Sequence, residues 1–243
     1  YMPHTFATYT ELALSAFKFN PRHNDTINKK KEILDSVVKS HHGIPETTLA
    51  FGFSPWLLTG THTNLFVTEI TDSIKDYLDQ QDVKYTYIPS EELGVTQQFD
   101  MVLAGDEYFT FAKDEEDQKH KVQRLSGLTK KVLLTTLRDY KNQDFRDREF
   151  SHPIAVRNSE KYKLFLEFND YGYKERDSWK STVYELGDAT AEVHGHFQRR
   201  SMYFKQLAKF TMDNGGLNYL VHRNLMYKSL IKKNYEHVIS ISY

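Results

Sequence analysis

A glycine and a glutamate, each at the end of a short apolar run, have a spacing that suggests a ligand-binding site. Gly52 lies in the run Thr48-Leu-Ala-Phe-Gly-Phe, and Glu69 lies 17 residues later in Asn64-Leu-Phe-Val-Thr-Glu-Ile. A glycine lets a ligand approach the backbone closely, and a carboxylate can accept hydrogen bonds from both hydroxyls of a ribose. This pair predicts a nucleoside-binding site.

Two further loops carry polar side chains that could complete such a site. Ser90 and Glu91 follow the apolar run that ends at Ile88, and they could hold an adenine amino group. Gly105, Asp106 and Tyr108 follow the run Phe99–Ala104 and place an acid and an aromatic ring beside the expected reacting centre. Asp106 or Tyr108 is the candidate for orienting or deprotonating a substrate.

These loops need a parallel sheet to bring them together, and the order of the apolar runs predicts one. Short apolar runs alternate with amphipathic helical stretches, which is typical of a doubly wound α/β sheet covered on both faces. In such a sheet ligands bind beyond the carboxyl ends of the strands. The expected strands are 48–53, 64–70, 83–88, 99–104 and 131–137, and the expected helices are 11–19, 24–40, 72–81 and 114–128. On the second helix, Lys29, Lys30 and Lys31 are expected to face water.

The rest of the chain predicts an insertion and a closing unit. Residues 161–168 and 181–186 flank the turn-rich Asn169-Asp-Tyr-Gly, which predicts a β-hairpin inserted within 155–190. A helix over 201–212 and strands over 217–221 and 237–241 would complete a seven-stranded sheet. We expect one domain over 1–243, with N-terminal helices in 1–46, a cofactor-binding half in 47–137 and a closing part in 200–243.

The four loops, taken in this order and spacing, resemble those of the class I S-adenosylmethionine-dependent methyltransferases over roughly 24–137. The resemblance implies S-adenosylmethionine as cofactor and a mostly parallel sheet whose last strand is antiparallel. We expect no metal. It implies Asp106 and Tyr108 as the catalytic pair. The cofactor-binding residues that it implies are Phe51, Gly52, Ser54, Glu69, Ile70, Ser90, Glu91 and Gly105.

The first loop departs from the acid-x-Gly-x-Gly pattern of that family. Ala50 stands at the position of the acid, Ser54 stands at that of the second glycine, and Pro55 removes a backbone donor. One alternative is therefore a methyltransferase-like module without catalysis, which a pocket filled by Phe53 or Trp56 would support. Another is a nicotinamide enzyme, which the absence of Gly-x-Gly-x-x-Gly after the first strand disfavours.

Composition limits the remaining function classes. The 32 basic and 33 acidic residues cancel, so net charge predicts neither a nucleic-acid nor a membrane-surface binder, and the methyl acceptor and the oligomeric state stay open. No cysteine is present, which excludes disulfides and thiolate chemistry and agrees with a cytoplasmic protein. No apolar run is long enough to span a membrane, and the first residues do not read as a secretion signal.

Three other segments carry weaker hypotheses. His194 and His196 alternate along an expected strand and could share a metal, although solvated histidines are the alternative. Arg199 and the following Tyr203 could grip a phosphate and a base at helical spacing, or form a solvated face. The charged stretch 139–149 could act as a substrate loop. In general texture the sequence also resembles proteins encoded by bacteriophages.

Overall fold

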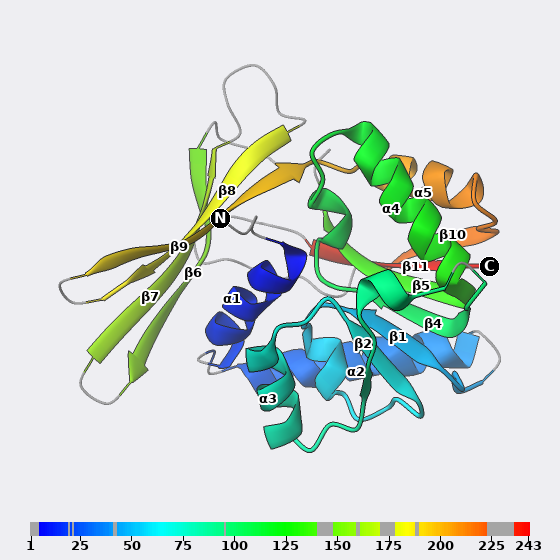
Figure 1. Cartoon of the computed structure of the whole chain (residues 1–243), viewed down its shortest axis with the longest axis horizontal. Helices are drawn as coiled ribbons and strands as arrows, with labels where there is room; N and C mark the ends of the chain where they lie inside the picture. The colour runs from blue at the N-terminus through cyan, green and yellow to red at the C-terminus, as the bar shows by residue number, and fades with distance from the viewer. Residues whose placement is uncertain are drawn as a thin grey trace.

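The computed structural model contains one seven-stranded sheet with helices on both faces and a second, four-stranded sheet beside it (Figure 1). The structure describes residues 5–18, 20, 22–40, 43–94, 96–139, 148–158, 161–170, 178–187, 190–222 and 236–243. None of the helices within these ranges is long and apolar enough to cross a membrane.

Helices and strands alternate along the first half of the chain as the apolar runs predict. In chain order the elements are α1 (Phe6–Lys18), α2 (His23–Ser40), β1 (Thr48–Phe51), η1 (Pro55–Leu58), β2 (Leu65–Thr68), α3 (Asp72–Gln80), β3 (Thr86–Tyr87), η2 (Ser90–Glu92), β4 (Phe99–Ala104), η3 (Tyr108–Thr110), α4 (Glu115–Leu128), β5 (Thr129–Arg138), β6 (Arg148–Asn158), β7 (Lys161–Asp170), β8 (Ser178–Leu186), β9 (Ala191–Arg200), α5 (Phe204–Met212), β10 (Asn218–His222) and β11 (Glu236–Ser242), where η marks a 3-10 helix.

The large sheet is doubly wound. Its strand order is β10-β11-β5-β4-β1-β2-β3, and β1 pairs in parallel with both β2 and β4. The last strand, β11, runs antiparallel to β5 and β10, as predicted. Because the chain leaves β1 towards one edge and later returns on its other side, the carboxyl ends of β1, β2 and β4 meet at the topological switch point.

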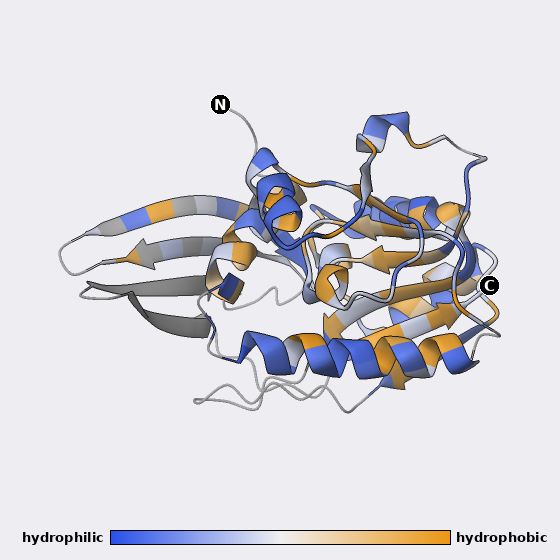
Figure 2. Cartoon of the chain, turned by 90° about the horizontal axis from the view of Figure 1, so that it is seen from below, coloured by the Kyte–Doolittle hydropathy of each residue, from blue (hydrophilic) through white to orange (hydrophobic). Residues whose placement is uncertain are grey.

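Two apolar cores lie on opposite faces of this sheet, since successive strand residues point to opposite sides. Leu49 and Phe51 of β1 join the core under α4 and α5, whereas Ala50 joins the core under α2 and α3. The strands and the helix faces turned towards them carry the apolar residues in Figure 2. Near-continuous apolar strands are therefore explained by burial on both faces.

Helix α1 crosses the edge of the sheet where the strands end. Phe6, in its first turn, belongs to the core under α4, whereas Leu14 and Phe17, further along, belong to the core under α2. Thr71 at the start of α3 donates a hydrogen bond to the Glu11 carboxylate at 2.9 Å. The helix thus lies directly over the loops that follow β1 and β4.

Lys30 corrects one expectation for α2. Lys29 and Lys31 are exposed as predicted, but Lys30 is buried. Its Nζ lies 3.3 Å from Asp106 Oδ1 and 4.1 Å from the centroid of the Trp56 ring. A carboxylate and an aromatic face compensate for the lost hydration of the ammonium group.

The second sheet confirms the predicted hairpin and extends it. Strands β7 and β8 pair antiparallel, and β6 and β9 add one strand on each side, so the sheet order is β6-β7-β8-β9. The end of β9 joins this sheet to the rest of the protein. Phe197 packs at 5.3 Å from the Tyr9 ring of α1, and the buried Arg199 lies 4.0 Å from the centroid of the Phe111 ring.

Candidate functional site

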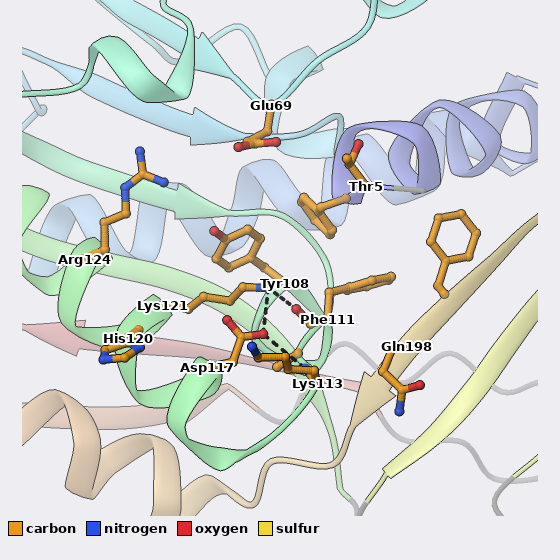
Figure 3. A pocket seen from close by; sticks show the side chains of 13 residues that line it. Thr5, Glu69, Tyr108, Phe111, Lys113, Asp117, His120, Lys121, Arg124 and Gln198 are labelled. Carbon is orange, nitrogen blue, oxygen red and sulfur yellow. Dashed lines mark hydrogen bonds and ion pairs between the residues drawn. The ribbon is translucent and has the colours of Figure 1, made fainter. Parts of the chain in front are cut away.

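A cavity of about 550 Å³ opens at the carboxyl ends of the central strands, between α1, α4 and the end of β9 (Figure 3). Four aromatic rings and several charged side chains share its wall. The residues that line it are Thr5, Phe6, Glu69, Tyr108, Phe111, Ala112, Lys113, Asp117, His120, Lys121, Arg124, Phe197 and Gln198. Its volume and mixed lining suit a nucleoside-sized ligand together with a small second molecule.

Glu69 directs its carboxylate into this cavity from the end of β2 (Figure 3). Its backbone has a φ of 55°, a left-handed conformation that is uncommon for residues other than glycine. No hydrogen-bond donor to this carboxylate is found in the part of the chain that the structure describes. The Glu69 carboxylate can therefore accept hydrogen bonds from a ligand.

Tyr108 forms the floor of the cavity. It begins η3 after β4 and is buried, with its ring edge-on to Phe6 at 4.9 Å. Burial raises the pKa of Tyr108 well above its ordinary value, and the nearby Glu69 carboxylate raises it further. The hydroxyl therefore stays protonated at neutral pH, so Tyr108 can orient a substrate but is poorly suited to deprotonate it.

The charged face of α4 forms the opposite wall. Lys121 is half-buried and donates a hydrogen bond to the carbonyl oxygen of Phe111. Burial lowers the pKa of Lys121, while the Asp117 and Glu69 carboxylates act in the opposite direction. Arg124 donates to the carbonyl oxygen of Ser90 in the third loop. Lys121 follows Asp117 by four residues and Arg124 follows Lys121 by three. This spacing puts the three side chains on one face of the predicted helix.

Gly52 and Gly105 lie side by side beneath Phe6. A β-carbon on Gly52 would lie 2.7 Å from Phe6 Cε1, and one on Gly105 would lie 2.8 Å from Phe6 Cζ. The Gly105 amide donates to the Phe51 carbonyl oxygen at 3.1 Å. The two loops thus meet as predicted, and one phenylalanine ring packs against both glycines.

Of the predicted cofactor-binding residues, all of which the structure describes, Glu69 alone lines the cavity. Phe51, Ser54 and Ile70 are buried, and Ser54 precedes η1. Ser90 and Glu91 form η2, to which Arg124 reaches from α4.

Asp106, predicted as a catalytic acid or base, also lies outside the cavity lining. One of its carboxylate oxygens accepts a hydrogen bond from Thr136 Oγ1 at 3.2 Å and pairs with Lys30. Asp106 therefore contributes to packing between β4, β5 and α2 in this structure.

Phe53 and Trp56 do not fill the cavity. Both belong to the core on the other face of the sheet, where Phe53 packs on Phe17 and Trp56 lies under Lys30. The observation that would have supported a module without catalysis is therefore not found at these two residues.

The weaker hypotheses have mixed outcomes. No group of three metal-binding side chains occurs within the described ranges, where His196 Nδ1 lies 2.9 Å from Thr182 Oγ1. The helical spacing proposed from Arg199 is wrong, because β9 continues to Arg200 and Arg199 is buried, with Nε and Nη2 donating to Thr110 Oγ1. Most of the stretch 139–149 lies outside the described residues.

Solved structures with the same architecture cover nearly the whole chain. An S-adenosylmethionine-bound amino pentose methyltransferase, CalS10 from Micromonospora echinaspora, has a TM-score of 0.66 at 10% identity and covers 99% of this chain and 99% of its own. An S-adenosylmethionine-dependent methyltransferase from Clostridium acetobutylicum has a TM-score of 0.64 at 11% identity, covering 88% of this chain and 91% of its own. The fold is that of the class I methyltransferases.

A third structure of the class I methyltransferase fold is similar to the same extent. The sugar N-methyltransferase KedS8 from a Streptoalloteichus species has a TM-score of 0.64 at 11% identity, and the match covers 98% of this chain and 93% of that one. The sequence itself matches no protein-family model and no curated protein. The likeness at this level of identity concerns the fold.

Proposed function

We propose that this protein binds S-adenosylmethionine in the cavity and transfers its methyl group to a small-molecule acceptor. The observation that carries the proposal is the position of the Glu69 carboxylate. It faces the cavity from the end of β2, beside the carboxyl ends of β1 and β4. This is where a doubly wound sheet binds the ribose of a nucleoside ligand.

When bound, S-adenosylmethionine would supply an activated methyl group. Glu69 would accept hydrogen bonds from its ribose hydroxyls, and the rings of Tyr108 and Phe111 would exclude water from the reacting atoms. The Tyr108 hydroxyl would orient the acceptor by donating a hydrogen bond. Burial lowers the pKa of the Lys121 ammonium group, which also lies in the wall of the cavity.

An amine on a small molecule is the acceptor that we infer. Two of the similar structures are an amino pentose methyltransferase and a sugar N-methyltransferase. The end of β9 contributes Phe197 and Gln198 to the wall of the cavity, so the second sheet would contact the acceptor. An acceptor amine that is protonated at neutral pH must lose that proton before its nitrogen can attack the methyl group, and its product loses a proton to solvent.

Calorimetric titration with S-adenosylhomocysteine tests the cofactor part of the proposal. We expect one ligand per chain, and an affinity at least tenfold lower for Glu69→Gln, since a charged hydrogen-bond acceptor contributes about 1.5–3 kcal/mol. Glu32→Gln is the matched control, because Glu32 is exposed on α2 and does not line the cavity. Equal affinity of all three proteins would contradict the assignment of Glu69.

A methyltransferase-like module without catalysis is the second candidate. The Phe6 ring packed against Gly52 and Gly105 favours it, because this ring takes up the space beside the first loop. If the wild type and a Phe6→Ala variant both fail to bind S-adenosylmethionine and S-adenosylhomocysteine at millimolar concentration, the module is the better account.

A further inference from the structure

The Phe6 ring covers the loops that contain Gly52 and Gly105. A cofactor bound against these loops would have to displace the ring. The Phe6 ring lies so close to Gly52 and Gly105 that a β-carbon added to either glycine would overlap it. The distance from the added β-carbon to the nearest ring atom would be 2.7 Å at Gly52 and 2.8 Å at Gly105. A ligand that used either glycine for close approach to the backbone would need the same volume.

Phe6 is held in this place by other aromatic rings. It is 7% exposed, and its ring lies edge-on to Tyr108 at 4.9 Å and to Phe111 at 5.1 Å. Both partners line the cavity. The contact is therefore a packed aromatic cluster, and displacing Phe6 from it costs free energy.

The rest of α1 is anchored independently of Phe6. Leu14 and Phe17 are buried in the core on the other face of the sheet, two or more turns further along the helix. Before Phe6, the exposed Thr5 accepts a hydrogen bond from the Thr8 amide at 3.4 Å. The first turn can therefore change its packing while the second half of α1 stays docked.

We propose that Phe6 is a gate on the part of the cofactor site beside Gly52 and Gly105, and that its ring must leave these two glycines before S-adenosylmethionine binds fully. This inference rests on the proposed function. The part of the site at Glu69 is open to the cavity, whereas the Phe6 ring covers the part beside Gly52 and Gly105. Cofactor affinity is then reduced by the fraction of molecules in which Phe6 is displaced.

Titration of S-adenosylhomocysteine into variants that shorten this side chain tests the gate. We expect Phe6→Ala to bind about tenfold more tightly than the wild type, and Phe6→Leu to lie between them, because a smaller side chain competes less for the space. Phe204→Ala is the control, since Phe204 lies on α5 against His237 at 5.6 Å and its loss should leave the affinity unchanged.

Each outcome decides the matter. Tighter binding in the order Ala, Leu, Phe, without an effect of Phe204→Ala, would support the gate. Unchanged or weaker binding by both Phe6 variants would overturn it and leave the proposed function standing. Absence of binding by the wild type and by both variants would instead overturn the proposed function, and the gate with it.

Discussion

Asp106→Asn should destabilise the protein without weakening cofactor binding. Asp106 faces the Nζ of Lys30 at 3.3 Å, and the Lys30 side chain is 2% exposed. Removing the carboxylate charge leaves the buried ammonium group against the Trp56 ring, whose centroid lies 4.1 Å away, and an aromatic face compensates a buried charge less than a carboxylate does. In the structure Asp106 pairs with Lys30, and the catalytic role suggested by the sequence stays a prediction.

The size of the effect follows from the burial of the two partners. Breaking a fully buried ion pair costs about 3–5 kcal/mol. Here the Asp106 side chain is 38% exposed, so water screens part of the interaction, and we expect a loss of about 2 kcal/mol. For a chain of this size that loss lowers the unfolding temperature by about 4–8 °C.

Thermal unfolding followed by circular dichroism, together with a double-mutant cycle, checks this prediction. Lys30→Met with Asp106→Asn removes both charges and keeps an apolar stem against Trp56, so the double variant should be more stable than Asp106→Asn alone. An Asp106→Asn protein that unfolds at the wild-type temperature would refute the reasoning. So would a tenfold loss of S-adenosylhomocysteine affinity, because Asp106 does not line the cavity.

Three further predictions concern stability. Gly52→Ala should lower the free energy of unfolding in urea by about 2–3 kcal/mol, because the φ of Gly52 is 73° and the added β-carbon meets α1. Gly127→Ala in α4 should instead raise it by about 0.5–1 kcal/mol, because open space surrounds Gly127. Burial raises the pKa of Tyr243 from its ordinary value to about 12. As the pH rises, Tyr243 therefore ionises in the unfolded chain before it ionises in the folded protein. The free energy of unfolding of the wild type should fall by about 1 kcal/mol between about pH 9 and about pH 11, whereas that of Tyr243→Phe should not, as urea unfolding at both pH values would show. Arg199→Lys should cost about 1–2 kcal/mol by the same assay, because lysine cannot donate from both Nε and Nη2 to Thr110; an unchanged midpoint would contradict this.

Local patterns were sufficient to predict the sheet. The run 99–104 became β4 with the predicted bounds, and the helix predicted from Asp114 begins where the Asp114 side chain accepts a hydrogen bond from the Asp117 amide at 2.8 Å. Apolar runs and helix caps each depend on residues that are close together in the sequence, so the sequence alone shows them. The order of these elements then limits the topology.

The contacts that α1 and α2 make with the loops after the strands were not predictable in the same way. Phe6 meets Gly52 and Gly105, and Lys30 meets Asp106, across long stretches of sequence. Such pairs depend on how α1 and α2 cross the sheet, and no local pattern records that geometry. The charged face of α4 could have been predicted, because the spacing of Asp117, Lys121 and Arg124 is helical.

The crystal structure of the protein with S-adenosylhomocysteine is the most direct test of the central claim. We predict that the ribose hydroxyls lie within about 2.6–3.2 Å of the Glu69 carboxylate oxygens. A nucleoside bound elsewhere, or one in the cavity whose ribose does not contact Glu69, would contradict the account.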